Sequence, residues 1–201
     1  MMEWTAFEDQ ARAEGYTCIC GIDEAGRGPL AGPVYAAAVV LRPGQVIEGV
    51  NDSKKLSEKK REALFDAICS QCAAYGIGSA TEKEIDEINI LNATYLAMQR
   101  AVAALPVQPD CALVDGNRAP DLPLEVRTII KGDAQSASIA AASILAKVSR
   151  DRYMLQMAEK YPQYAFEKHK GYGTKLHYER LEQYGISPIH RLSLLKKWMN
   201  R

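Results

Sequence analysis

The sequence predicts an α/β protein built on a mixed β-sheet flanked by helices. Two β-rich segments come early, at 17–24 and 33–41, and helical patterns mix with short apolar runs later in the chain. Strands that come first and then mix with helices are typical of α/β folds with a mixed sheet. The 201 residues, 47% of them hydrophobic, fit one domain and can bury a sizeable core.

Each expected element has local support. The first two strands flank a glycine-rich turn. Ser57 is the expected N-cap of the first helix, and Thr81 resembles a second capped start. Asn89 is expected to cap an apolar helix that closes before Pro106. In chain order we expect strands at 17–24 and 33–41, a helix from Ser57 to about Ala74, a strand at 75–80, a helix start at Thr81, a helix at 90–104, strands at 111–115 and 125–130, and helices at 136–160, 174–184 and 190–199.

Composition argues against several classes of protein. No apolar run is long enough to span a membrane, and the N-terminus lacks the basic and apolar regions of a signal peptide. The five cysteines are an odd number without the density of a disulfide framework. Cys69 and Cys72 have the spacing of a redox motif but fall inside a helical pattern, so we expect them to pack. We therefore expect a cytoplasmic protein with no membrane contact, and a monomer.

Charge is balanced overall but uneven along the chain. Lys and Arg together number 25, as do Asp and Glu, and zero net charge argues weakly against nucleic-acid binding. Residues 168–201, however, hold eight basic and two acidic side chains, a net charge of +6. An aromatic residue among such cations suits a nucleic-acid groove, and Tyr172 stands there between two glycines. The alternative is that Tyr172 packs in a core, as tyrosines more often do.

Two adjacent carboxylates, Asp23 and Glu24, end the first β-rich run. A half-buried strand alternates apolar and polar side chains, so adjacent acids put at least one of them on the costly face. A bound cation would offset that cost, and hard divalent cations prefer oxygen ligands. The turn of Gly26, Arg27 and Gly28 follows at once. The alternative is a polar strand end with both acids solvated, next to a plain β-turn.

Two further acids share this placement, since Asp115 ends a later strand and Asp133 follows another. Ligands often gather where strand ends meet. Converging carboxylates without cysteine or a neighbouring histidine suit two magnesium or manganese ions (Mg2+ or Mn2+), which can promote phosphodiester cleavage. The alternative is that both acids are turn formers, which is common for Asp.

Six segments carry a resemblance to a known family: 21–30 (GIDEAGRGPL), 51–56 (NDSKKL), 115–117 (DGN), 131–133 (KGD), 139–148 (IAAASILAKV) and 169–174 (HKGYGT). In this order they resemble the signatures of bacterial ribonuclease HII, over nearly the whole chain. The resemblance implies an RNase H-like catalytic domain at 1–160 and a small basic, helical, substrate-binding extension at 161–201. It also implies a metal-dependent endonuclease that cleaves RNA in RNA–DNA hybrids and single ribonucleotides embedded in duplex DNA. The expected products bear 5′-phosphate and 3′-hydroxyl ends.

The resemblance assigns roles residue by residue. It implies that the catalytic and metal-binding acids are Asp23, Glu24, Asp115 and Asp133. The family's turn that reads the ribose 2′-hydroxyl matches Gly26, Arg27 and Gly28. The tyrosine that stacks on the following deoxyribose matches Tyr172. One departure is visible: Leu194 stands where the family has phenylalanine, which concerns the packing of the C-terminal element rather than the chemistry.

Other residues are candidates for contacts with backbone phosphates, which give affinity without sequence information. These substrate-binding candidates are Ser53, Lys54, Lys55, His169 and Lys170. A solvated turn is the alternative for 53–55, above all for Lys55, and His169 could serve the structure instead. Ser143 and Lys147 share one helix face and could lie near the site. Lys59, Lys60 and Arg61 are expected on a solvent-facing helical surface.

Two rival functions remain. A DNA nuclease or resolvase of similar fold would not need a 2′-hydroxyl, and the turn at 26–28 speaks against it. A non-enzymatic module that binds hybrids would have lost its acids, and the four intact carboxylates speak against that.

Overall fold

The computed structural model of this chain describes residues 4–51, 53 and 56–200. Its elements, in chain order, are α1 Ala6–Ala13, β1 Ile19–Ala25, β2 Val34–Val40, α2 Glu58–Gln71, β3 Ala74–Ala80, α3 Glu82–Ala103, β4 Cys111–Asp115, β5 Glu125–Ile129, the 3-10 turn η2 Gly132–Ala134, α4 Ala137–Lys160, the 3-10 turn η3 Pro162–Tyr164, α5 Phe166–His169, α6 Lys175–Tyr184 and α7 Leu192–Met199.

The strands form one five-stranded sheet in the order β3-β2-β1-β4-β5. β2 pairs antiparallel with both β1 and β3, whereas β4 pairs parallel with both β1 and β5. The sheet is therefore mixed, and the predicted fold class is confirmed.

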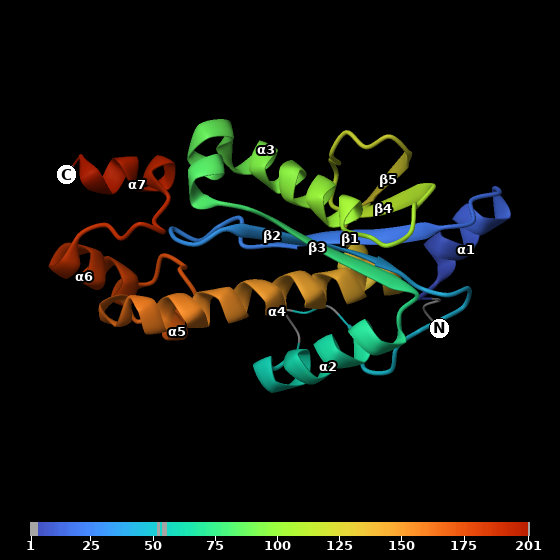
Figure 1. The fold of residues 1–201 in the computed structure, drawn as a ribbon, viewed down its shortest axis with the longest axis horizontal. Coiled ribbons are helices and arrows are strands. Elements are labelled where there is room, and N and C mark those ends of the chain that lie inside the picture. The colour runs from blue at the N-terminus through green and yellow to red at the C-terminus, as the bar shows by residue number, and fades with distance from the viewer. Residues whose placement is uncertain (1–3, 52, 54–55, 201) are drawn as a thin grey trace.

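Helices cover both faces of the sheet. α3 lies on one face, and α4 and α2 lie on the other (Figure 1). The C-terminal helices α5, α6 and α7 gather at one end of the molecule, and α1 lies at the opposite end. α4 passes very close to β1, because a Cβ added at Gly21 would lie 2.3 Å from the backbone carbon of Ser138.

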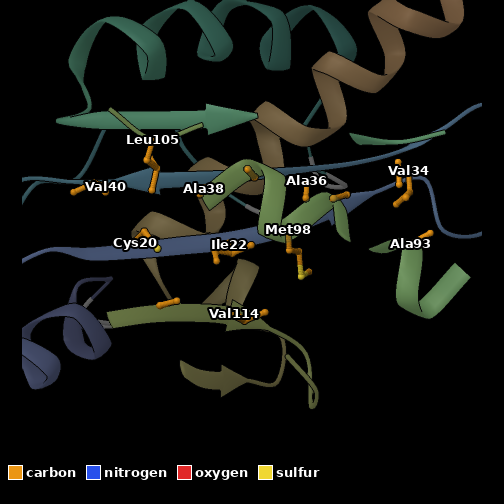
Figure 2. Packing of buried hydrophobic residues seen from close by; sticks show 14 of the residues in the cluster. Cys20, Ile22, Val34, Ala36, Ala38, Val40, Ala93, Met98, Leu105 and Val114 are labelled. Atoms are coloured by element: carbon orange, nitrogen blue, oxygen red, sulfur yellow. The ribbon is translucent and has the colours of Figure 1, made fainter. Parts of the chain in front are cut away.

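The core between the sheet and α3 follows from strand alternation. Cys20 and Ile22 of β1 point to the same face, as residues two apart in a strand do. They pack with alternate residues of β2 and with the inner side of α3, including Met98 (Figure 2). The alternate residues Ile19, Gly21, Asp23 and Ala25 point to the opposite face, towards α4, so the strand brings the carboxylate of Asp23 to a buried position.

Capping signals located the helix starts correctly. The Ser57 side chain accepts a hydrogen bond from the backbone of Lys60. Thr81 and Glu84 form a reciprocal capping box at the start of α3. The Asn89 Oδ1 atom accepts hydrogen bonds from the backbone N–H groups of Leu91 and Asn92, as the predicted cap requires.

α3 consists of two helical segments separated by the non-helical backbone of Asn89, at φ 68° and ψ 164°, as the two helices predicted after Thr81 and Asn89 require. The structure corrects two other details of the predicted elements. α2 ends at Gln71 rather than near Ala74, because Cys72 turns extended and the next N–H joins the sheet at Val40. α1 has no counterpart among the predicted elements; it docks through Glu8 onto Ser136 and Ser138 at the start of α4. Within the described part of the chain, no helix is both long enough and apolar enough to cross a membrane.

Candidate active site

The sheet register brings Asp23 and Asp115 together. β1 and β4 are parallel, and their last paired residues are Ile22 and Val114. Asp23 and Asp115 come next on each strand, so both lie at the carboxyl ends of adjacent strands. The sequence prediction that these acids share one edge of the sheet is therefore supported by the register.

Asp23 is buried, with 5% of its surface exposed. Burial raises the pKa of its carboxyl group well above the usual range, and the charges of Glu24 and Asp115 raise it further. Its Oδ1 atom accepts a hydrogen bond of 2.7 Å from the backbone N–H of Glu24. A carboxylate in this position is destabilised by its surroundings unless a proton or a cation joins it.

The fourth acid, Asp133, lies in the η2 turn and is also buried. The Oδ1 atom of Asp115 accepts hydrogen bonds from the backbone N–H groups of Gly132 at 2.6 Å and of Asp133 at 3.4 Å. Lys131, which enters the turn, has a left-handed backbone with φ 56°. Asp115 thus fixes the turn that carries Asp133.

A cavity of about 260 Å³ collects most of the predicted site. Its walls comprise Asp23, Glu24, Ala25, Gly26, Arg27, Gly28, Ser53, Asp115, Ser143, Lys147 and Tyr172. Ser143 and Lys147 therefore lie near the acids, as their helical spacing suggested. Asp133 is not among these lining residues, but its backbone N–H lies 3.4 Å from the Oδ1 atom of Asp115.

The donor atoms fit a hard divalent cation, but they do not form a closed cage. Asp23, Glu24 and Asp115 offer only carboxylate oxygens, the ligands that Mg2+ and Mn2+ prefer. Burial, and then the charges of Glu24 and Asp115, raise the pKa of Asp23, and a bound cation would offset both effects. Among the described residues, no group of three or more His, Cys, Asp or Glu side chains is already arranged as a metal site.

The turn after β1 needs glycine at its first position. Gly26 has φ 97°, and an added Cβ would lie 2.1 Å from the Nε atom of Arg150. The Arg27 side chain is half-exposed and forms an ion pair of 3.5 Å with Glu24. The turn therefore lies between a buried arginine on one side and the carboxylates on the other.

Tyr172 faces the same cavity from the C-terminal region. Its surface is 42% exposed, which favours a surface role over core packing. The Arg150 guanidinium carbon lies 5.7 Å from the centre of its ring. A Cβ at Gly28 would lie 3.8 Å from the ring, so Tyr172 and the turn are neighbours.

Ser53 is buried beside the acids. Its hydroxyl lies 2.7 Å from that of Ser143, and its carbonyl accepts a hydrogen bond from Arg61. Arg61 was expected on a solvent-facing surface and is instead mostly buried, because it also donates to the carbonyl of Leu56. The predicted contact residues Lys54 and Lys55 lie outside the described residues.

The remaining substrate-binding candidates, His169 and Lys170, have different surroundings. His169 is buried, and its Nδ1 and Nε2 atoms bond to the backbone of Gly171 and Tyr164. This arrangement fits the structural alternative for His169. The Lys170 ammonium donates to the carbonyl of Glu167 and lies 3.8 Å from Glu58.

Sequence reasoning missed two buried arginines that hold the site. Arg150 donates to the carbonyls of Pro33, Ala31 and Lys170. Arg191 likewise donates to the carbonyls of Gly26, Arg27 and Gly32. Arg150 falls on the same face of α4 as the buried Ala146 and Met154, and that spacing could have revealed a buried charge.

Comparison with known proteins places the chain in a family. A family profile described as Ribonuclease HII matches residues 20–197. Ribonuclease HII of Caldicellulosiruptor bescii is 59% identical over 94% of this chain and 92% of the relative. Ribonuclease HII of Marinomonas sp. is 61% identical over 87% of this chain and 88% of the relative.

Solved structures agree with this assignment. Ribonuclease H2 from Pyrococcus horikoshii OT3 aligns with a TM-score of 0.73 at 30% identity, over 88% of this chain and 93% of that chain. Bst-RNase HIII in complex with Mn2+ shares the fold, with a TM-score of 0.68 at 18% identity over 91% of this chain and 68% of that chain. The chain therefore belongs to the ribonuclease HII family and is a ribonuclease H endonuclease.

Proposed function

We propose that this endonuclease requires divalent metal ions and cuts both RNA–DNA hybrids and single ribonucleotides embedded in duplex DNA. One observation carries the proposal. The buried carboxylate Asp23 lies in the same cavity as a glycine turn and an exposed tyrosine, Tyr172. Charge to hold a cation and groups to recognise a sugar are thereby combined in one place.

The residues proposed to hold the ions are Asp23, Glu24, Asp115 and Asp133. When bound, two Mg2+ or Mn2+ ions supply the Lewis acidity that activates a water and stabilises the departing 3′-oxygen. Asp23 would contribute a carboxylate whose charge is disfavoured by burial and by its acidic neighbours. Asp115 contributes a second carboxylate and keeps the Asp133 turn in place through its bond to Gly132.

Recognition of the sugar is assigned to four residues, Gly26, Arg27, Gly28 and Tyr172, which we call the ribose reader. Glycine adds no Cβ, so a ribose can approach the backbone of the turn closely. Backbone amides there would bond the 2′-hydroxyl, the group that distinguishes RNA from DNA. The Tyr172 ring would stack on the next sugar, which must then be a deoxyribose. The proposed cut falls on the 5′ side of a single ribonucleotide and leaves 5′-phosphate and 3′-hydroxyl ends.

The rest of the molecule has supporting roles in the proposal. The basic extension 161–201 binds the phosphate backbone, with Lys170 as a contact, and the catalytic domain is 1–160. Ser53, which lines the cavity, is proposed to contact phosphate, and so is Lys54. The cysteines are free thiols, which fits the reducing cytoplasm and the monomer that we propose.

The metal requirement can be tested directly. Protein stripped with EDTA is mixed with an end-labelled RNA–DNA hybrid, and Mg2+ or Mn2+ is then titrated in. We expect no cutting before addition, recovery with either ion, and products whose 5′ ends carry phosphate. Undiminished cutting in EDTA, or 3′-phosphate products, would overturn the proposal.

A further inference from the structure

The two halves of the ribose reader come from opposite ends of the chain and are joined by one short segment. The backbone of 189–191 pairs with that of 30–32, next to the turn. Arg191 N–H donates to the Leu30 carbonyl at 2.8 Å, and Gly32 N–H donates to the Ile189 carbonyl at 2.9 Å. Figure 1 shows the C-terminal helices beside the connection between β1 and β2. Two side chains of this segment, from His190 and Arg191, extend the link to both halves of the reader.

Arg191 forms hydrogen bonds with the glycine turn from the buried side. It is completely buried, and its Nη2, Nη1 and Nε atoms donate to the carbonyls of Gly26 at 2.6 Å, Arg27 at 3.0 Å and Gly32 at 2.7 Å. Burial lowers the pKa of this guanidinium to about 9, so carbonyl dipoles must compensate its charge.

These hydrogen bonds fix the direction of the amides in the turn. In a trans peptide the C=O and N–H groups point in opposite directions, and the described chain contains no cis peptide. The peptide that carries the Gly26 carbonyl also carries the N–H of Arg27, and that of the Arg27 carbonyl carries the N–H of Gly28. Because both carbonyls point at Arg191, both N–H groups point away from it. Both residues line the cavity, so the cavity is where these donors can meet a hydroxyl.

His190 reaches the other half of the reader through a second histidine. The Nδ1 atom of His190 accepts a hydrogen bond from the Ser187 N–H at 2.9 Å, so a neutral His190 carries its proton on Nε2. That proton is donated to the Nε2 atom of His177 at 2.9 Å. His177 must then carry its own proton on Nδ1, which donates to the Tyr172 carbonyl at 2.9 Å.

The packing around this relay favours the neutral form of both rings. His190 and His177 are 3% and 0% exposed, and the ring of His169 stacks on His177 with centroids 4.3 Å apart. Phe166 lies edge-on to His177. A second proton on either ring would place two donors face to face. Each hydrogen of the relay therefore has one direction, and the relay ends on the backbone of Tyr172.

We propose that His190 and Arg191 together are the positioning element of the ribose reader. Arg191 directs the amides of Arg27 and Gly28 toward the 2′-hydroxyl. His190, acting through His177, fixes the position of the Tyr172 backbone. The inference rests on the proposed function, since it assumes that the reader meets a ribonucleotide.

The role proposed for Arg191 and the role proposed for His190 and His177 predict different effects on two substrates. One substrate is a duplex with one ribonucleotide, and the other is a hybrid with a long RNA strand. Both substrates use the turn, so Arg191→Lys, which keeps the charge but loses the fork, should lower kcat/KM on both by about tenfold or more. Only the single-ribonucleotide duplex uses the deoxyribose contact of Tyr172. His177→Leu should therefore lower kcat/KM on that duplex several-fold more than on the long hybrid. His177→Asn, whose amide can still donate to the Tyr172 carbonyl, should restore much of the lost preference.

The control is Arg152→Lys, the same substitution on α4 at a guanidinium that bonds Glu62 rather than the turn. It should leave both substrates unchanged. Tm is measured for every variant, because a purely structural role would lower activity on both substrates alike, in step with lost stability.

The outcomes separate the inference from the function on which it rests. If the wild-type protein cuts neither substrate, the proposed function fails. If it cuts both, and His177→Leu keeps the wild-type ratio between them or His177→Asn behaves as His177→Leu does, the inference is wrong. If Arg191→Lys does not fold, the two His177 variants decide the matter. Wild-type activity in a folded Arg191→Lys variant would overturn the role proposed for Arg191.

Discussion

The Asp115 side chain holds the backbone of Gly132 by a hydrogen bond of 2.6 Å, and through it ties the end of β4 to the turn that follows β5. Asp133, one residue later and itself buried, is thereby kept next to Asp115. Its position rests on a bond from the end of β4 to the turn, so changes at Asp133 need not disturb the sheet.

Asp133→Asn is expected to abolish most turnover while the protein stays folded and still binds hybrid. An amide keeps the shape of the side chain but cannot neutralise a divalent cation. Cleavage rates in Mg2+, circular dichroism and hybrid binding test this together. Asp121→Asn, an exposed acid in the loop after β4, serves as the matched control. Near wild-type turnover of Asp133→Asn would leave Asp133 as a turn residue only.

Asp23→Asn is expected to raise the stability of the metal-free protein while it removes activity. The substitution takes away a buried charge that faces Glu24 and Asp115, yet Asn can still accept the N–H of Glu24. For a chain of this size each kcal/mol relieved raises Tm by about 2–4 °C. Thermal unfolding in EDTA measures the change. A lower Tm for the variant would show that the carboxylate is well compensated by its surroundings.

The histidine relay predicts a loss of stability in mild acid. Burial lowers the pKa of His177 to about 4 and of His190 to about 3, whereas both rings bind a proton near pH 6.5 in the unfolded chain. Between these values the unfolded chain binds more protons, so the free energy of unfolding falls as the pH falls from about 6.5 towards 4.

Urea unfolding at a series of pH values tests this dependence. His190→Gln removes one of the titrating rings, so the slope of the unfolding free energy against pH should drop by up to about 1.4 kcal/mol per pH unit in that window. An unchanged slope would mean that His190 stays neutral in the unfolded chain or charged in the folded one.

Hybrid affinity is expected to fall with added salt, because bound phosphates release counterions. Lys170→Ala should reduce the slope of log affinity against log salt by about one unit. The Lys170 side chain is only 14% exposed, so binding must draw it away from Glu58 and the Glu167 carbonyl. Arg12→Ala on α1, at the far end of the molecule (Figure 1), should leave the slope unchanged. Equal slopes for Lys170→Ala and wild type would place Lys170 outside the contact surface.

Local signals predicted most of the fold. The caps at Ser57, Thr81 and Asn89 are side-chain bonds within three residues, and the sequence shows both partners. The early end of α2 was not predictable in this way, because it depends on a bond from residue 73 to Val40 in a distant strand. α1 depends on a contact between Glu8 and the start of α4, more than a hundred residues away.

The candidate site was likewise predictable only where the signal is local in the sequence. The placement of Asp23 and Asp115 followed from two strand ends, which a parallel register brings together. The support of the turn did not, because Arg150 and Arg191 bond backbone carbonyls, and carbonyls leave no mark on residue type. The burial of Arg61 was missed for the same reason.

The central claim, that this enzyme reads one 2′-hydroxyl, is tested most directly by a labelled duplex with a single ribonucleotide beside its all-DNA twin. Both are incubated with wild-type protein and Mg2+ or Mn2+, and the cut is mapped at nucleotide resolution. We predict one cut on the 5′ side of the ribonucleotide and none in the twin, because only the first offers a hydroxyl to the amides at Arg27 and Gly28. Equal cutting of both duplexes would contradict the account and favour a DNA nuclease of the same fold.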